Sequence, residues 1–264
     1  MIMSQSDRAA AFRRLHEDGL LILPNAWDAG TARLMASLGA KAVATTSAGV
    51  AWAHGWPDGD VLPAARLVET ARAVAGAVGV PVSIDIEGGY GDDPAAVAGT
   101  ARAVWDAGAV GINIEDGGGA AEALAEKIAA IRAACGPGLF INARCDVWLR
   151  GLGGLDEGLA RAALYRAAGA DGFFAPGLAE AETIRALAAG IHMPLNLMAV
   201  PGLPEAAALT ALGVRRLSAG AAISAAAMGL VRDRARDFLA TGDAAPLGQG
   251  AMGWAELNGI MART

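Results

Sequence analysis

The sequence has few aromatic residues, two cysteines and no excess of basic charge. Aromatic residues make up 5% of the 264 positions, so the core must be built from small aliphatic side chains. Two cysteines without a CxxC spacing argue against a disulfide framework or a cysteine-based zinc site, and we expect a reducing, cytoplasmic location. The net charge of −6 argues against a surface for nucleic acid or anionic membranes.

Long uninterrupted apolar runs are also missing, although 54% of the residues are hydrophobic. The longest window without charge, Ala186–Pro204, is broken by Gly190 and by three prolines. A second apolar stretch, Leu217–Val231, is shorter than the roughly 20 residues that a membrane-spanning helix needs. The first residues carry charges where a signal peptide has its apolar core, so we expect a soluble protein that is not exported.

Short apolar runs rich in β-branched residues alternate with helical stretches along the whole chain. Eight runs are expected as strands: Leu20–Pro24, Lys41–Thr46, Pro81–Asp85, Ala109–Glu115, Leu139–Arg144, Asp171–Ala175, Pro194–Met198 and Val214–Ser218. Helices are expected over Asp28–Leu38, Leu62–Val78, Pro94–Ala107, Ala120–Ala134, Leu155–Ala168, Ala179–Ala188 and Leu203–Leu212. Four of the helices end at a glycine that is expected in a left-handed cap: Gly39, Gly108, Gly169 and Gly213.

Strict alternation of strand and helix predicts parallel strands, and eight units in about 250 residues fit a TIM (β/α)8 barrel. A doubly wound open sheet is the alternative, but it normally uses fewer strands. Nothing divides the chain, so residues 1–264 are expected to form one domain, with a helical extension over residues 219–264. That extension exceeds what a barrel needs, and its apolar part is expected to pack against another subunit.

Polar side chains gather at the carboxyl ends of the expected strands, where TIM barrels carry their active sites. Asp85, Glu87 and Glu115 are carboxylates whose like charges are costly side by side unless a cation joins them. Oxygen ligands of this kind suit Mg²⁺, with Mn²⁺ as a substitute. Arg144, on the next strand, could bind a substrate carboxylate, or it could form an ordinary ion pair with a neighbouring aspartate.

Six segments give the chain a family resemblance. They read PNAWDAGTARL (24–34), TTSAGVAWAHGWPD (45–58), SIDIEGGYG (83–91), GINIEDG (111–117), INARCDVWL (141–149) and RRLSAG (215–220). In this order they resemble the isocitrate lyase/phosphoenolpyruvate mutase superfamily over most of the chain. The resemblance implies a Mg²⁺-dependent TIM barrel that binds 2-oxo acids and passes through an enolate-like intermediate. It also implies homodimers that exchange C-terminal helices, or homotetramers built from them.

The resemblance assigns roles to individual residues. It makes Asp85 a direct Mg²⁺ ligand, places Glu87 and Glu115 in the coordination sphere, and makes Arg144 the residue that binds or stabilises the substrate. The remaining residues that it implicates are substrate-binding Thr45, Thr46, Ser47, Asn196 and Tyr90, and Asp58 near the metal. The expected catalytic residues are Arg144, Asp58 and Glu115.

Two departures from the family pattern bear on the reaction. The loop Gly117–Ala125 contains none of the Cys, His and Lys residues that the lyase branch uses for acid–base catalysis, nor the Lys and Asn of the mutase branch. Glu87 stands where better-known members have Asp, which moves the carboxylate by about 1.3 Å and could make a water-mediated ligand a direct one.

The function expected from these observations is a Mg²⁺-dependent carbon–carbon lyase that acts on a small 2-oxo mono- or dicarboxylic acid through an enolate. Oxaloacetate decarboxylation is the simplest example. Two alternatives stay open: phosphorus–carbon bond chemistry of the phosphonopyruvate type, and a catalytically decayed protein that binds 2-oxo acids without turning them over.

Overall fold

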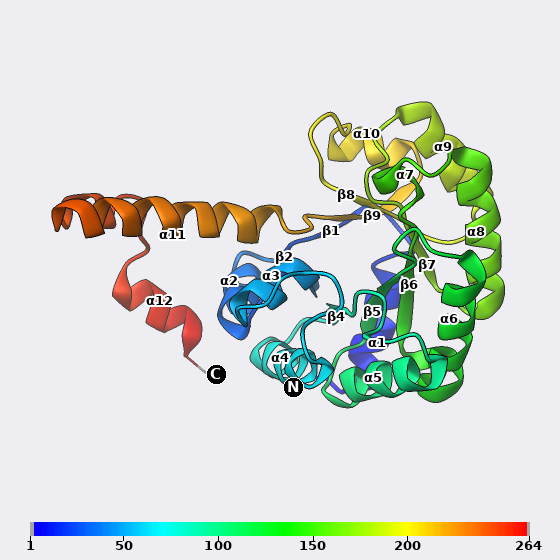
Figure 1. The fold of residues 1–264 in the computed structure, drawn as a ribbon, viewed down its shortest axis with the longest axis horizontal. Helices are drawn as coiled ribbons and strands as arrows, with labels where there is room; N and C mark the ends of the chain where they lie inside the picture. The colour runs from blue at the N-terminus through cyan, green and yellow to red at the C-terminus, as the bar shows by residue number, and fades with distance from the viewer. Residues whose placement is uncertain (1–2, 263–264) are drawn as a thin grey trace.

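The computed structural model describes residues 3–262 and has the architecture of a parallel β-barrel surrounded by helices (Figure 1). All strand pairs are parallel, in the order β1-β9-β8-β7-β6-β5-β4-β3-β2. The strands are β1 Leu21–Leu23, β2 Asn25–Ala26, β3 Val43–Thr45, β4 Val82–Asp85, β5 Gly111–Glu115, β6 Phe140–Arg144, β7 Gly172–Phe174, β8 Leu195–Met198 and β9 Val214–Ser218. The expected α/β barrel is therefore confirmed.

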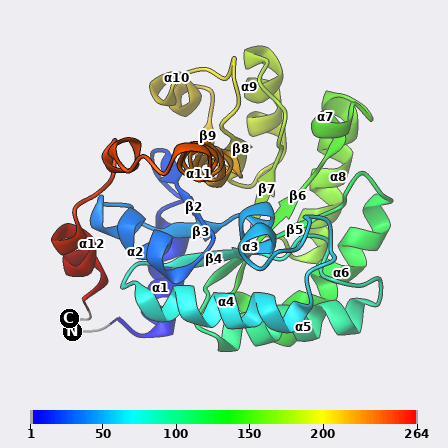
Figure 2. The ribbon, with the colours of Figure 1, turned by 60° about the vertical axis from the view of Figure 1, so that its left-hand side comes forward.

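The helices are arranged around the barrel, except that the first closes its amino-terminal end and the last two do not belong to the ring (Figures 1 and 2). They are α1 Gln5–Arg14, α2 Ala29–Ser37, α3 Ser47–Ala53, α4 Ala64–Ala77, α5 Pro94–Asp106, α6 Ala121–Cys135, α7 Val147–Arg150, α8 Leu155–Ala168, α9 Ala181–Gly190, α10 Ala206–Ala211, α11 Ala222–Thr241 and α12 Trp254–Met261; 3₁₀ turns cover η1 Gly136–Gly138 and η2 Ala245–Gly248. The four glycines expected at left-handed helix exits all have positive φ. No described helix is long and apolar enough to cross a membrane.

The first expected strand is interrupted at Pro24, which explains why nine strands occupy eight barrel positions. β1 pairs with β9 through Leu21–Leu23, whereas β2 pairs with β3 through Asn25 and Ala26. Proline has no backbone N–H to donate, so the ladder breaks at this residue. The carbonyl of Pro24 still accepts a hydrogen bond from the N–H of Ala44, so the two halves join β9 to β3 and bring the barrel close to full closure.

A small apolar cluster fills the amino-terminal end of the barrel, and α1 contributes part of it. Phe12 is fully buried and meets Phe140 edge to face, with ring centroids 5.4 Å apart. His16, just after α1, stacks on the same Phe140 ring at 4.4 Å. The cluster needs Gly111 at the start of β5, because a Cβ atom there would lie 2.7 Å from the Phe12 ring. Helix α1 therefore closes the barrel floor.

Above this floor the barrel interior becomes polar. The side chains of β5 alternate: Ile112 and Ile114 join the large hydrophobic core under the helices, whereas Asn113 is buried on the opposite, inner side. The inner polar layer also contains Asn142, Asn196, Arg216 and Ser218, all with 2% exposure or less. The barrel interior thus has an apolar floor, a polar middle layer and, above it, the charged side chains described below.

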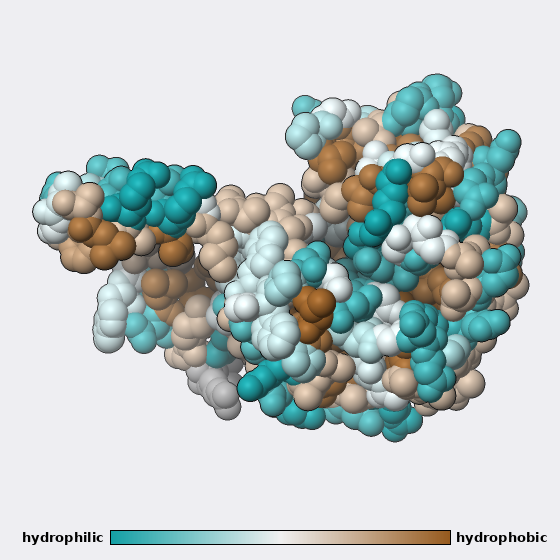
Figure 3. Space-filling model, in the orientation of Figure 1, coloured by the Kyte–Doolittle hydropathy of each residue, from teal (hydrophilic) through white to brown (hydrophobic). Residues whose placement is uncertain are grey.

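The two C-terminal helices do not complete the ring around the barrel. Helix α11 follows β9 but extends away from the barrel as an arm, and Ser224 is its one described buried residue (Figure 1). Its exposed apolar side chains are Ile223, Met228, Leu230, Val231, Phe238 and Leu239. Figure 3 shows charged residues along the upper side of this arm and apolar residues beneath it. The arm leaves a large apolar surface without a partner within the described chain.

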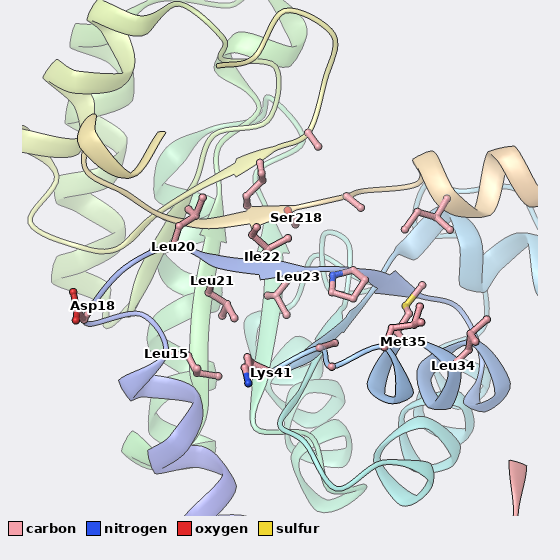
Figure 4. A pocket seen from close by; sticks show the side chains of 18 residues that line it. Leu15, Asp18, Leu20, Leu21, Ile22, Leu23, Leu34, Met35, Lys41 and Ser218 are labelled. Carbon is pink, nitrogen blue, oxygen red and sulfur yellow. The ribbon is translucent and has the colours of Figure 1, made fainter. Parts of the chain in front are cut away.

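An apolar groove of about 710 Å³ lies beside the outer faces of β1 and β9, where a barrel of this type would carry the helix after its last strand. Figure 4 shows the side chains that line it, from Asp18 and Leu15 at one end to Met35 and Leu34 at the other. Ile22 points into it and is 57% exposed. We call this surface the open groove.

The contact between Gly111 and Phe12 gives a testable prediction about stability. Gly111→Ala is expected to lower the free energy of unfolding by about 1–3 kcal/mol, because the new methyl group forces the Phe12 ring to move in a packed cluster. Urea denaturation followed by circular dichroism measures this change. The matched control is Gly99→Ala on α5, where a Cβ meets nothing within 4 Å and a gain of up to about 1 kcal/mol is expected. Equal stability of Gly111→Ala and the wild type would refute the role of this close approach.

Candidate active site at the carboxyl end of the barrel

A cavity of about 160 Å³ opens at the carboxyl end of the strands. Its lining combines side chains of opposite charge with amides, hydroxyls and a few apolar groups. The lining residues are Asn25, Thr46, Ser47, Ala48, Asp58, Asp85, Asn113, Arg144, Phe174, Met198, Ser218, Gly220 and Ala221. They come from segments spread along the whole chain, which the barrel brings to one place.

Asp85, at the end of β4, is held by several hydrogen bonds. Its Oδ1 accepts from the N–H of Glu87 at 3.0 Å, and its Oδ2 accepts from the side-chain amide of Asn113 at 3.2 Å. Its own N–H donates to the hydroxyl of Thr45 at 2.9 Å. Burial raises the pKa of the Asp85 carboxyl, an effect that the positive charge of Arg144 opposes. Each carboxylate oxygen keeps acceptor capacity for a further partner.

Arg144, at the end of β6, joins two carboxylates at the cavity wall. Its Nη1 lies 2.5 Å from Oε2 of Glu115, and its Nε and Nη2 contact the two oxygens of Asp146 at 2.7 and 3.1 Å. Burial disfavours the charge, but Glu115 and Asp146 raise the pKa of Arg144 and keep it protonated. The guanidinium carbon lies 5.9 Å from the centre of the Phe174 ring. Both alternatives for Arg144 are therefore present, because it is ion-paired and also lines the cavity.

Glu87 faces away from the cavity and organises the loop after β3. Its Oε2 accepts from the backbone N–H groups of Gly59 and Asp60, and its Oε1 accepts from the hydroxyl of Tyr90 at 2.8 Å. The carboxylate of Asp60 in turn accepts from the N–H groups of Gly88 and Tyr90. The longer glutamate side chain thus reaches a neighbouring loop, and Tyr90 supports Glu87 rather than lining the cavity.

The segment after β3 supplies one wall of the cavity. Thr46 precedes α3 and Ser47 begins it, and both line the cavity, as does Asp58 in the loop between α3 and α4. The first N–H groups of a helix have no partner within the helix, so this wall can donate hydrogen bonds to an anion. Burial and the charge of Glu87 raise the pKa of Asp58, whereas a hydrogen bond from Ser47 lowers it. Thr45 does not reach the cavity.

The donor set fits a magnesium ion held mostly by water. Within residues 3–262, no three Asp, Glu, His or Cys side chains converge closely enough to form a protein-only ligand set. Mg²⁺ commonly takes one or two carboxylates together with water and substrate oxygens. Asp85, which lines the cavity and has a free lone pair on each oxygen, meets this requirement. Glu87 and Glu115 are engaged with Tyr90 and Arg144, so they could reach an ion only through water.

The loop between β5 and α6, which lacks the acid–base residues of the lyase branch, is anchored by Asp116. Oδ1 of Asp116 accepts from the N–H groups of Gly118 and Asp146, and Oδ2 accepts from Arg161 and Tyr165. Gly118 lies so close to the chain after β6 that a Cβ there would be 2.7 Å from the Arg150 side chain. The loop is therefore packed against its neighbour.

The candidate residues from the sequence fall into two groups. Thr46, Ser47, Asp58, Asp85 and Arg144 meet at the cavity; those just behind its wall are Thr45, Glu87, Tyr90, Glu115 and Asn196.

The sequence analysis missed several lining residues: Asn25, Asn113, Phe174, Met198 and Ser218. Asn113 could have been found, because it interrupts the apolar pattern of GINIE at an inward position. Phe174 and Met198 carry no such signal, since apolar residues at strand ends also occur in cores.

Residues 12–239 match the phosphoenolpyruvate phosphomutase family. An uncharacterised protein of Mycobacterium tuberculosis is 38% identical over 218 residues, which cover 80% of this chain and 81% of that protein. An oxaloacetate decarboxylase of Rhodopseudomonas palustris is 30% identical over 275 aligned positions, covering 92% of this chain and 91% of the relative.

Solved structures agree with this relationship. A lyase/mutase from Burkholderia cenocepacia superposes with a TM-score of 0.89 at 39% identity and covers 98% of this chain and 97% of its own. A phosphonopyruvate hydrolase bound to oxalate and Mg²⁺ superposes with a TM-score of 0.84 at 25% identity, covering 96% and 94%. The chain therefore belongs to the isocitrate lyase/phosphoenolpyruvate mutase superfamily, whose members include lyases and mutases.

Proposed function

We propose that the protein is a Mg²⁺-dependent carbon–carbon lyase that acts on a small 2-oxo acid through an enolate, with oxaloacetate decarboxylation as the simplest reaction. The observation that carries this proposal is the cavity of about 160 Å³, because Asp85, Arg144, Thr46 and Ser47 all line it. Family relatives that act on oxaloacetate, and one that holds oxalate and Mg²⁺, support the same substrate class.

Different residues of the cavity would bind different parts of the substrate. Thr46 and Ser47 would bind the carboxylate with their hydroxyls and with the N–H groups at the start of α3. Asp85 would hold the Mg²⁺ ion, which supplies Lewis-acid polarisation of the 2-oxo group when bound. Phe174 and Met198 would lie along the remainder of the substrate and exclude water from the reacting bond.

Arg144 would stabilise the negative charge that develops during bond cleavage. When the bond between C3 and C4 of oxaloacetate breaks, CO₂ leaves and the electron pair remains as the enolate of pyruvate. A fixed guanidinium stabilises such charge best when it needs no rearrangement, and Asp146 holds Arg144 by two hydrogen bonds. Enolate formation by loss of CO₂ needs no protein base, so the reaction is compatible with a loop that lacks Cys, His and Lys.

The enolate must finally take up a proton at C3. Asp58 lines the cavity and has a raised pKa, and Glu115 next to Arg144 has a pKa raised by burial to about 8. Both carboxyls therefore hold a proton more readily than an exposed acid does. Asp58 is our candidate for delivering it, because Glu115 is engaged by Arg144.

Two other functions are distinguished by turnover. A decayed member of the family would bind oxalate and 2-oxo acids but would release no product. Phosphorus–carbon chemistry would need cations for a migrating phosphoryl group. The β5–α6 loop has none, and the neighbouring Arg150 would have to supply the charge.

We propose further that two copies of the chain form a dimer by exchanging α11. The apolar side chains of α11 have no partner on their own barrel, and the open groove lies where a helix after the last strand would pack. The same chain thus offers an apolar helix and an apolar groove that meet only at Ile223, in the first turn of α11. Seating each α11 in the partner's groove would cover both surfaces and would keep the ring of helices complete.

Binding of Mg²⁺ together with oxalate, a stable mimic of the pyruvate enolate, tests the proposed site. At ligand concentrations near 100 times Kd, binding adds about 2.7 kcal/mol and should raise Tm by about 5–10 °C. The rise is expected only with both components present and should be lost in Asp85→Ala. The control is Asp92→Ala, an exposed carboxylate after the same strand.

Release of pyruvate from oxaloacetate, followed with a coupled assay, then separates the enzyme from the decayed binder. Pyruvate formation above the Mg²⁺-catalysed background supports the lyase. A thermal shift without pyruvate formation supports the binder, and the absence of any shift refutes both.

The raised pKa of Glu115 predicts a pH dependence of stability. Between the unfolded pKa near 4.5 and the folded value of about 8, the folded protein holds a proton on Glu115 that the unfolded chain releases. The free energy of unfolding therefore falls as the pH rises through this window. In EDTA-treated protein, Glu115→Gln should lose less stability than the wild type between pH 5 and pH 8 in urea denaturation. The control, exposed Glu126→Gln, should follow the wild type, and parallel curves for all three proteins would contradict the assignment.

The exchanged dimer is tested by placing a charge in the open groove. Ile22→Arg should convert the dimer to a monomer in light scattering coupled to size-exclusion chromatography, because it buries a guanidinium against apolar α11 residues. Glu126→Arg on the opposite side of the barrel serves as the control and should remain dimeric. A wild-type protein that is monomeric at micromolar concentration would exclude this arrangement.

A further inference from the structure

Arg216 on β9 is the largest fully buried side chain of the described chain, and it lies in the polar layer inside the barrel. Its Nη2 donates to the amide oxygen of Asn113 at 3.2 Å. Its Nε and Nη1 have no hydrogen-bond partner within residues 3–262. Burial lowers its pKa to about 10, so the side chain still carries a positive charge at neutral pH.

Arg216 makes one hydrogen bond, and the attraction of the Asp85 charge opposes the cost of burying its own charge. A buried charge with unpaired donors is costly, and an apolar side chain of similar size would avoid that cost. The aromatic floor below does not compensate it, because burial and the nearby Arg216 lower the pKa of His16 to about 3 and leave that ring neutral. The part of Arg216 that does make contact points to Asn113.

Arg216 and Asn142 together fix the orientation of the Asn113 amide. The side-chain nitrogen of Asn142 donates to Oδ1 of Asn113 at 2.9 Å, next to the bond from Arg216. A flipped amide would turn its NH₂ group toward two donors, and would turn its oxygen toward the carboxylate of Asp85. The observed orientation is therefore the one that donates from Nδ2 to Asp85.

This bond decides how Asp85 presents its carboxylate to the cavity. Oδ1 is held by the N–H of Glu87 and Oδ2 by Asn113, so the plane of the carboxylate is fixed at both oxygens. Each oxygen has one further lone pair for a ligand. Hydrogen bonds to ligating carboxylates of this kind commonly change metal affinity by about 10–100-fold.

We propose that Arg216 is a positioning residue for the metal site, which acts by holding the Asn113 amide in the orientation that donates to Asp85. This inference rests on the proposed function, because it assigns Asp85 to the metal. Arg216 lies below Asn113 and does not line the cavity, so it is not expected to touch the substrate.

Binding of Mn²⁺ alone, measured by the loss of the free-ion electron paramagnetic resonance signal, tests the proposal without any turnover. Arg216→Met should raise the Kd for Mn²⁺ about tenfold while Tm stays equal to or above that of the wild type, because an unpaired buried charge is removed. Asn113→Leu should raise Kd by a similar factor, and the double variant should show no additional loss. Arg216→Lys, which keeps a donor, should recover most of the affinity.

The matched control is Arg215→Met, the half-buried neighbour on the same strand, which should leave Kd within twofold of the wild type. Unchanged or tighter Mn²⁺ binding in a folded Arg216→Met would overturn the proposal, and so would losses that add in the double variant. If Arg216→Met does not fold, Arg216→Lys and Asn113→Leu decide in the same assay. A wild type whose Mn²⁺ binding is absent or unaffected by Asp85→Ala would instead refute the proposed function.

Discussion

The burial of Asp85 at the end of β4 is the constraint on which the arrangement of the site depends. A carboxylate taken out of water needs hydrogen bonds or opposite charge, and the Asp85 carboxylate receives both, as hydrogen bonds from Glu87 and Asn113 and as the positive charge of Arg144. Each of these groups comes from a different loop or strand. The strands must therefore keep their register for Asp85 to stay satisfied, and this links the closure of the barrel directly to the geometry of the cavity.

The barrel interior separates stability from chemistry along its axis. At the floor, Phe12 and Phe140 pack their rings edge to face, and the buried ring of His16 stacks on Phe140. At the mouth, Asp85 and Glu115 are carboxyls with raised pKa values, and Arg144 is ion-paired. Burying these groups lowers the folding stability, but it places strong charges where a substrate would bind. In the amide layer between them, Arg216 donates a hydrogen bond to Asn113, and Asn113 donates one to Asp85. The proposed substrate chemistry thus takes place directly above an amide layer that is joined to Asp85 by hydrogen bonds.

The loop after β5 shows how one scaffold accommodates different reactions. Asp116 binds the loop to Arg161 and Tyr165, and the glycines allow it to pack against Arg150. The loop thus has no acid–base side chain to offer and contributes shape instead. A reaction that needs only binding, polarisation of a 2-oxo group and charge stabilisation fits such a loop. In the proposed reaction the remaining proton transfer would fall to a carboxyl at the cavity wall, for which Asp58 is the candidate.

The sequence by itself determined the barrel, the order of its elements and the kind of chemistry at its mouth, because the alternation of strand and helix and the position of polar residues at strand ends are local patterns. It also predicted that Asp85 and Arg144 belong to the same site. Only the tertiary structure decided which polar groups face the cavity: Glu87 turns to Tyr90 and the Asp60 loop, and Asn113 and Arg216 form an inner layer. The split of the first strand at Pro24 and the course of α11 away from the barrel were decided there too. These features depend on contacts between residues far apart in the chain, which no local pattern encodes.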